Sequence, residues 1–206
     1  MAKQETVKIA VFDINGTLYQ KSSKEKFFKY VCFRKDYKLF DIFNLVLFKL
    51  LGKARLIDQT QFKENFFNYL DDIPPETVDR YAREFWGVEF PRYFSKRLLQ
   101  RVEELKSEGI QIFCISGALE VYLKPLFEYL EVDAYYGTEA VYKNGTYLLK
   151  GKACKDEVKV QRLDKHFGDQ PYCIVEAYSD EAEMILDKAE KGYLVDPDGT
   201  IEPYTP

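Results

Sequence analysis

The sequence has little excess charge of either sign. Its formal net charge at pH 7 is −4, and no basic stripe alternates with aromatic residues. Domains that bind nucleic acid usually carry such a stripe, so we expect no nucleic-acid partner. Hydrophobic residues make up 46% of the chain and charged residues 31%. This balance provides enough apolar material for a sizeable core.

Paired cysteine motifs are also absent. The four cysteines, Cys32, Cys114, Cys154 and Cys173, are scattered without a C-x-x-C pair, and two of them stand inside apolar runs. A reduced thiol in such a run behaves as a small hydrophobe. The N-terminal stretch MAKQETVK has no secretory apolar region. These features predict a reducing, cytoplasmic compartment.

The sequence lacks an apolar run of membrane-spanning length. Its most apolar segment, Leu39 to Leu51, contains Asp41 and Lys49. A helix that crosses a bilayer needs about 20 apolar residues, so we expect no stable membrane insertion. We interpret the segment as a helix buried in a helical domain, with a membrane-surface helix as the alternative.

Short apolar runs alternate with helical patterns near both ends of the chain. TVKIAVFD, IQIFCIS, YCIVEAYSD and GYLVDP predict buried strands, and helices are predicted over about 119–130 and 158–166. AVYKNGTYLL predicts a hairpin, because Asn144-Gly145 suits a two-residue type I′ turn. This alternation predicts an α/β fold whose mostly parallel sheet is covered on both faces.

From Ser23 to about Lys106 the pattern is almost wholly helical. One expected helix places Phe62, Phe66 and Leu70 on one face, and a second does the same with Leu98, Val102 and Leu105. The block falls between the first and second strands of the α/β pattern. We therefore predict an α/β core from residues 1–18 and 107–206, with an inserted helical cap from 19 to 106.

Polar residues follow three of the predicted strands, and they predict a phosphoryl site. Asp13, Ser116 and Asp180 stand where ligands bind in open α/β sheets, outside the carboxyl ends of the strands. A carboxylate can attack phosphorus and form an acyl-phosphate. The turn after Asp13 can present amides to an anion, and acidic residues near Asp180 can hold Mg²⁺. Taken alone, Asp13 is equally compatible with a turn former.

Four stretches in order resemble the motifs of the haloacid dehalogenase superfamily, in its phosphoserine-phosphatase-like subfamily. Asp13-Ile-Asn-Gly-Thr17 resembles D-x-D-G-T, CISG supplies Ser116, the helix after the hairpin supplies Lys159, and YSDEAE supplies Asp180. The resemblance covers essentially the whole chain. It implies a Rossmann-like core with a helical cap and a magnesium-dependent phosphohydrolase. Such an enzyme acts on a small phosphorylated molecule through an aspartyl-phosphate intermediate.

The resemblance also implies roles for particular residues. Asp13 takes the place of the nucleophile and Asn15 the place of the general acid–base. The implied catalytic set is Asp13, Asn15, Ser116 and Lys159; the phosphate-binding set is Ser116, Gly117 and Lys159; the Mg²⁺ ligands are Asp13, Asn15 through its backbone carbonyl, and Asp180.

Two departures from the family pattern keep an alternative open. Asn15 replaces the second acid of the first motif. In the fourth motif Met184 stands four residues after Asp180, where the family has an acid, so Glu181 and Glu183 are the nearest acids that could assist a metal. The alternative is a degenerate protein that binds a phosphorylated ligand or a protein partner with little or no turnover.

Other charged residues have competing interpretations. Lys155 is the alternative to Lys159 for the lysine of the third motif. His166, the only histidine, is interpreted as a capping or surface group at a helix end. Lys21 and Lys24, close after the first motif, suit a second anionic group on the substrate and predict that phosphoserine is a poor substrate.

Overall fold

The computed structural model of the chain describes residues 5–34 and 68–205. The apolar segment Leu39–Leu51 lies outside the described residues. The same holds for the expected helix face of Phe62 and Phe66, although Leu70 is described.

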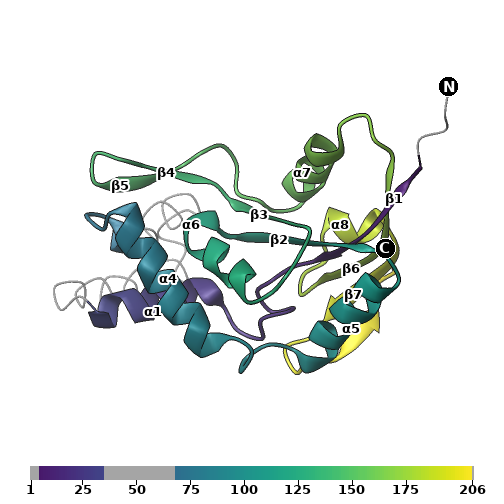
Figure 1. Ribbon diagram of the computed structural model, residues 1–206, viewed down its shortest axis with the longest axis horizontal. Helices are drawn as coiled ribbons and strands as arrows, with labels where there is room; N and C mark the ends of the chain where they lie inside the picture. Colours follow the sequence, from purple (N-terminus) through teal and green to yellow (C-terminus); the bar gives the residue numbers. More distant parts are fainter. Residues whose placement is uncertain (1–4, 35–67, 206) are drawn as a thin grey trace, which may run out of the picture.

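A single six-stranded sheet forms the centre of the molecule (Figure 1). Its spatial order is β3-β2-β1-β6-β7-β8, with bounds Ala134–Thr138, Gln111–Leu119, Val7–Phe12, Tyr172–Ser179, Ala189–Val195 and Ile201–Pro203. All neighbouring strands are parallel except β7 and β8, which are antiparallel. The predicted mostly parallel sheet is confirmed, and β1 lies at its centre between β2 and β6.

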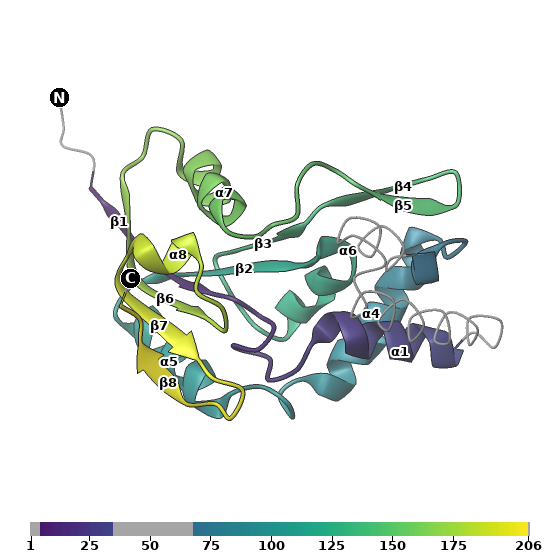
Figure 2. The ribbon, with the colours of Figure 1, turned by 180° about the vertical axis from the view of Figure 1, so that it is seen from behind.

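Helices cover both faces of this sheet. In β1, Ile9 and Val11 pack on one face under α7 (Glu157–Phe167) and α8 (Met184–Asp187). Ala10 and Phe12 pack on the other face, where α5 (Lys96–Ser107) lies (Figure 2). Because β1 is buried on both sides, it appears in the sequence as a continuous apolar run and not as an alternating one.

The remaining helices lie together to one side of the sheet (Figure 1). They are α1 (Ser23–Arg34), the short 3₁₀ helix η2 (Asn68–Leu70), α4 (Pro75–Glu89), α6 (Glu120–Leu123) and the 3₁₀ helix η3 (Lys124–Glu128). An aromatic cluster joins them: Phe27 stacks on Tyr122, and the indole nitrogen of Trp86 donates to the Tyr122 carbonyl oxygen at 2.7 Å. α5 falls within the predicted cap range yet packs against β2. The division into core and cap stays a prediction.

Local chemistry explains where the elements differ from the sequence prediction. The single helix expected over 119–130 is instead α6 followed by η3, because Pro125 has no amide hydrogen to continue an α-helical ladder. β2 also extends beyond Ser116 to Leu119. The expected hairpin is present as β4 (Ala140–Lys143) and β5 (Thr146–Leu149). Its turn residues Asn144 and Gly145 have φ of 52° and 82°, as a type I′ turn requires.

The hairpin reaches across to the chain between η2 and α4. The Thr146 hydroxyl donates to Asp71 Oδ1 at 2.6 Å, and the Tyr147 hydroxyl donates to the Ile73 carbonyl oxygen at 3.1 Å. No helix in the described ranges is both long and apolar enough to cross a membrane. All four cysteines are free thiols.

Candidate active site

Asp13 follows β1 directly, and its backbone is fixed by the neighbouring strand. Its amide donates to the Tyr178 carbonyl oxygen of β6 at 2.9 Å. The Ile14 amide donates to Asp13 Oδ1 at 2.5 Å. The Asp13 side chain is 11% exposed. The strand therefore ends on a carboxylate that is held in place and still reaches a pocket.

The pocket above Asp13 has a volume of about 210 Å³. It is lined from β1, β2 and β6, from the start of α1, and from the hairpin and the loop before α7. Five residues of the implied catalytic, phosphate-binding and metal-binding sets line it: Asp13, Asn15, Ser116, Gly117 and Asp180. The fold thus brings together residues that lie far apart in the chain, while their chemical roles stay predictions.

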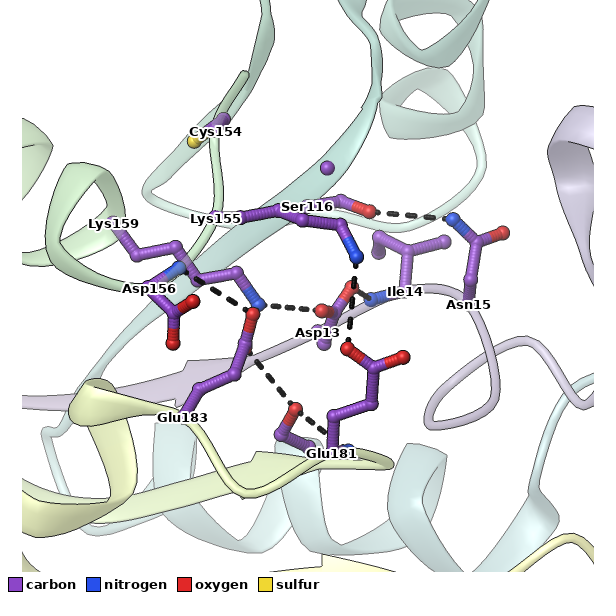
Figure 3. A network of polar contacts seen from close by, with 12 residues as sticks. Asp13, Ile14, Asn15, Ser116, Cys154, Lys155, Asp156, Lys159, Glu181 and Glu183 are labelled. Carbon is purple, nitrogen blue, oxygen red and sulfur yellow. Dashed lines mark hydrogen bonds and ion pairs between the residues drawn. The ribbon is translucent and has the colours of Figure 1, made fainter. Parts of the chain in front are cut away.

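Lys159 does not itself line the pocket, but it bonds to Asp13, which does (Figure 3). Its ammonium donates to Asp13 Oδ2 at 2.5 Å and to Glu183 Oε2, and its side chain is 1% exposed. Burial lowers the pKa of Lys159, but the two carboxylates outweigh burial, so the pKa is raised. Lys155 instead pairs with the exposed Glu181 at 3.5 Å. Of these two lysines, Lys159 is the one in contact with Asp13, whereas Lys155 is the one that lines the pocket.

Glu183 holds the lysine in place. Besides Lys159, its carboxylate accepts a hydrogen bond from the Ser179 hydroxyl at 3.2 Å and one from the Asp156 amide at 3.5 Å. Ser179 also precedes Asp180 in the fourth motif. The acid three residues after Asp180 is therefore used to position Lys159, a role that the sequence analysis did not assign to it.

Asn15 connects the first helix of the cap range to β2. Its side-chain oxygen accepts a hydrogen bond from the Ser23 amide at 2.8 Å, at the start of α1. Its side-chain nitrogen donates to Ser116 Oγ at 3.4 Å. Ser116 Oγ also accepts from the Ala118 amide at 3.4 Å. An amide cannot exchange a proton near neutral pH, so Asn15 can orient groups but cannot act as an acid or base.

Asp180 lies against the loop that follows Asp13, and the oxygen atoms there suit Mg²⁺. Gly16 has φ +69°, and a Cβ on it would lie 2.2 Å from Asp180 Oδ2, so only glycine permits this close approach. Burial, followed by the charge of Asp13, raises the pKa of Asp180 to about 6. In the described part of the chain Asp180 forms no ion pair.

A cation would relieve the repulsion between the two carboxylates. Mg²⁺ is typically bound by one or two carboxylates and keeps several waters. Asp13 and Asp180 offer two such carboxylates, and the family resemblance implies the backbone carbonyl of Asn15 as a third ligand. Residues 5–34 and 68–205 contain no group of three or more His, Cys, Asp or Glu side chains arranged for a metal. Two neighbouring carboxylates are a donor set that suits Mg²⁺.

The sequence analysis missed two residues that shape the pocket. Thr138, at the end of β3, donates to the Gly117 carbonyl oxygen at 2.9 Å and accepts from the Cys154 amide at 3.0 Å. It thereby ties β2 to the loop before α7. Tyr122 lines the pocket from α6. Its only sequence signal is a position six residues after Ser116 at the start of a helix.

His166 takes no part in the pocket. Its Nδ1 lies 2.6 Å from the Tyr136 hydroxyl, and its ring packs edge-on against Phe113. It stands in the last turn of α7, as expected for a group at a helix end.

Comparison with known proteins finds one family model that matches most of the chain. A family model described as haloacid dehalogenase-like hydrolase matches residues 10–183. A search of curated proteins finds no match.

Solved structures share the fold over almost the whole chain. A protein of unknown function from Bordetella pertussis Tohama I has a TM-score of 0.73 at 16% identity, over 91% of this chain and 89% of its own. A phosphoserine phosphohydrolase-like protein from Francisella tularensis subsp. tularensis SCHU S4 has a TM-score of 0.59 at 20% identity, over 90% and 86%. A phospho-aspartyl intermediate analogue of phosphoserine phosphatase has a TM-score of 0.58 at 18% identity, over 91% and 86%. At these identities the likeness concerns the fold.

Proposed function

We propose a function from the premise that the chain belongs to the haloacid dehalogenase-like hydrolase family. This membership confirms the resemblance inferred from the four motifs and the expectation of a hydrolase. The proposed activity is magnesium-dependent hydrolysis of a small phosphorylated molecule through an aspartyl-phosphate at Asp13. One observation carries the proposal: the Asp13 carboxylate faces a pocket shared with Ser116 and Asp180, and the Lys159 ammonium bonds to that carboxylate.

The residues of the chain divide the reaction between them. An Asp13 oxygen attacks phosphorus, and the bond to the leaving oxygen breaks. Lys159, the Ser116 hydroxyl and the Gly117 amide hold the phosphoryl oxygens. Mg²⁺ bound by Asp13, Asp180 and the Asn15 carbonyl would neutralise charge on the phosphoryl group. Water then attacks the aspartyl-phosphate and releases phosphate and free Asp13.

Trapping the intermediate tests the proposal. Wild-type protein with Mg²⁺ should release phosphate from an aryl phosphate, and acid-quenched protein should carry one phosphoryl group on the peptide that contains Asp13. Asp13→Asn should abolish both signals, because a covalent nucleophile cannot be replaced by an amide; we expect a loss on the order of 10⁴-fold or more. Asp164→Asn is the matched control, since Asp164 bonds Tyr172 on the surface. Phosphate release that survives Asp13→Asn would overturn the assignment.

Asn15 favours a second candidate function. Without an acid–base at this position, the protein would bind a phosphorylated ligand or a protein partner with little or no turnover. A phosphate analogue that raises the melting temperature, together with no phosphate release and no phosphorylated Asp13, would favour this candidate.

The pocket charges suggest which substrates to test. Lys24 and Lys155 line it, whereas Lys21 lies over the Tyr93 ring and 3.8 Å from Glu89. Lysines near the mouth favour a second anionic group and disfavour an ammonium group. We therefore propose that phosphoserine is a poor substrate. A kinetic comparison with 3-phosphooxypropanoate, which lacks only the ammonium group, should show the higher kcat/KM for the latter; the reverse order would contradict the proposal.

The proposal extends to compartment and partners. Four free thiols, Cys32, Cys114, Cys154 and Cys173, support a reducing, cytoplasmic setting. The net charge of −4 supports a small-molecule substrate and no nucleic-acid partner.

A further inference from the structure

Two buried hydroxyl groups near Asn15 lack hydrogen-bond partners. The side chains of Ser23 and Tyr122 are 0% exposed, and neither hydroxyl has a partner in the described structure. A buried hydroxyl without a partner costs about 1–3 kcal/mol. Such groups are rare in native proteins and point to a bound water or ligand.

The Tyr122 ring is fixed from two sides. It stacks on Phe27 of α1 with ring centroids 4.7 Å apart, and its own backbone oxygen is held by Trp86. The Ser23 side chain and the Leu119 amide approach the hydroxyl without reaching normal hydrogen-bond geometry, and both lower its pKa. Burial is the larger effect and raises the pKa of Tyr122 to about 12, so the hydroxyl is protonated at neutral pH.

This hydroxyl lies where two chain segments meet Asn15. Tyr122 lines the same pocket as Asp13 and Asn15. The Ser23 amide bonds the Asn15 oxygen, and the Asn15 nitrogen bonds Ser116, three residues before Leu119 on β2. The oxygen and the nitrogen of the Asn15 side chain thus each have a partner within the protein, whereas the Tyr122 hydroxyl has no acceptor for its proton in the part of the chain that the structure describes.

Few other groups in the pocket can supply a proton to a leaving oxygen. Asp13 is the proposed nucleophile, Asp180 is a proposed Mg²⁺ ligand, and Glu183 is bonded to Lys159. Lys155 is paired with Glu181 at the rim. Lys24, which also lines the pocket, is the competing proton donor.

We propose that the Tyr122 hydroxyl contacts the leaving-group oxygen of the substrate and donates the proton that Asn15 cannot supply. This inference rests on the proposed function. As Asp13 bonds to phosphorus, the bond from phosphorus to the leaving oxygen breaks and its electron pair stays on that oxygen. The oxygen takes the Tyr122 proton and departs as an alcohol. In the second step the tyrosinate takes a proton from the water that attacks the aspartyl-phosphate.

Tyr122→Phe removes this proton and little else. The ring, its stack on Phe27 and the backbone bond to Trp86 remain. We expect kcat for a primary alkyl phosphate to fall by about 10- to 100-fold, because proton donation matters most for a basic leaving group. With p-nitrophenyl phosphate, whose leaving group is acidic, the fall should be about threefold or less. The melting temperature should be unchanged or higher, since no hydrogen bond is lost.

Two further variants isolate the role of Tyr122. In an Asn15→Asp background the new carboxyl group supplies the proton, so adding Tyr122→Phe should change alkyl phosphate turnover by less than about twofold. Tyr147→Phe is the matched control, because this buried tyrosine bonds Ile73 outside the pocket. Lys24→Gln tests the competing donor and should not reproduce the dependence on leaving group.

Each outcome decides the inference. If Tyr122→Phe loses equal activity with alkyl and aryl phosphates, Tyr122 contributes to binding only. If its activity is unchanged with both, the Tyr122 hydroxyl contacts only a water molecule. Either result overturns the inference. The same dependence on leaving group in Lys24→Gln and not in Tyr122→Phe would also overturn it. Wild-type protein that releases no phosphate from either ester would instead overturn the proposed function, and this inference with it.

Discussion

The two walls beside Asp13 are built in opposite ways. The lysine wall consists of Lys159, Glu183 and Ser179, and its charges are paired within the protein. The hydroxyl wall consists of Asn15, Ser23 and Tyr122, and two of its hydroxyls have no partner in the described residues. Pre-organised charge suits the phosphoryl group, whose shape is the same in every substrate. Hydrogen-bonding groups left open suit the leaving group, which differs between substrates.

The largest effect should come from breaking the lysine wall with Lys159→Met. Removing the ammonium group leaves Asp13 and Glu183 buried without a cation, which should lower the free energy of unfolding at pH 7 by about 3–5 kcal/mol. Turnover should fall by about 10²–10³-fold, because the phosphoryl group loses its charged donor. Urea unfolding and steady-state kinetics measure the two effects.

A double variant separates chemistry from folding. Lys159→Met with Glu183→Gln removes one uncompensated charge, so it should regain part of the stability without regaining turnover. Full activity in Lys159→Met would make Lys159 a purely structural lysine.

Asn15→Asp sharpens the comparison by giving the hydroxyl wall an acid. Aspartate can still accept the hydrogen bond from the Ser23 amide. We expect hydrolysis of alkyl phosphates to rise by at least about tenfold and hydrolysis of aryl phosphates to rise less. Asn144→Asp in the hairpin turn is the control. If the variant's activity toward both classes is equal to that of the wild type or lower, an acid at position 15 does not restore catalysis. The non-catalytic candidate would then be favoured.

Glu183→Gln weakens the lysine wall and leaves Lys159 bonded to Asp13. A neutral acceptor holds the ammonium group less strongly, so kcat should fall by about tenfold or less. Glu181→Gln, at the exposed rim, should change stability by less than about 1 kcal/mol. If Glu181→Gln lowered kcat more than Glu183→Gln does, Glu181 and not Glu183 would be the acid that acts in the site.

The smallest effect concerns two adjacent serines at the start of α1. Ser22 caps the helix, because its hydroxyl accepts the Glu25 amide at 3.4 Å, so Ser22→Ala should cost about 1 kcal/mol. Ser23→Ala removes a buried hydroxyl without a partner and should leave stability unchanged or raise it slightly. Thermal unfolding compares the two. Equal destabilisation would mean that the Ser23 hydroxyl holds Tyr122 in the native protein.

The strand pattern and the motif positions could be predicted from the sequence. A strand buried on both faces must be continuously apolar, and parallel strands bring their carboxyl ends to one edge of the sheet. The sequence alone could therefore place Asp13, Ser116 and Asp180 at the same edge of the sheet. The break between α6 and η3 was also encoded, in Pro125, but the apolar spacing around it favoured one longer helix.

By itself, the sequence determined the identity of Asp13 as a carboxylate at a strand end and the replacement of its neighbouring acid by Asn15. Only the tertiary structure decided which partners the other side chains take. Glu183 turns toward Lys159 across 24 residues of sequence, and Asn15 bonds Ser116 across 101. The open hydroxyl of Tyr122 likewise depends on how α6 packs against α1. These partners depend on the directions in which the side chains point in a packed interior, because each buried polar group must find a partner nearby. The residue types along the chain do not specify those directions.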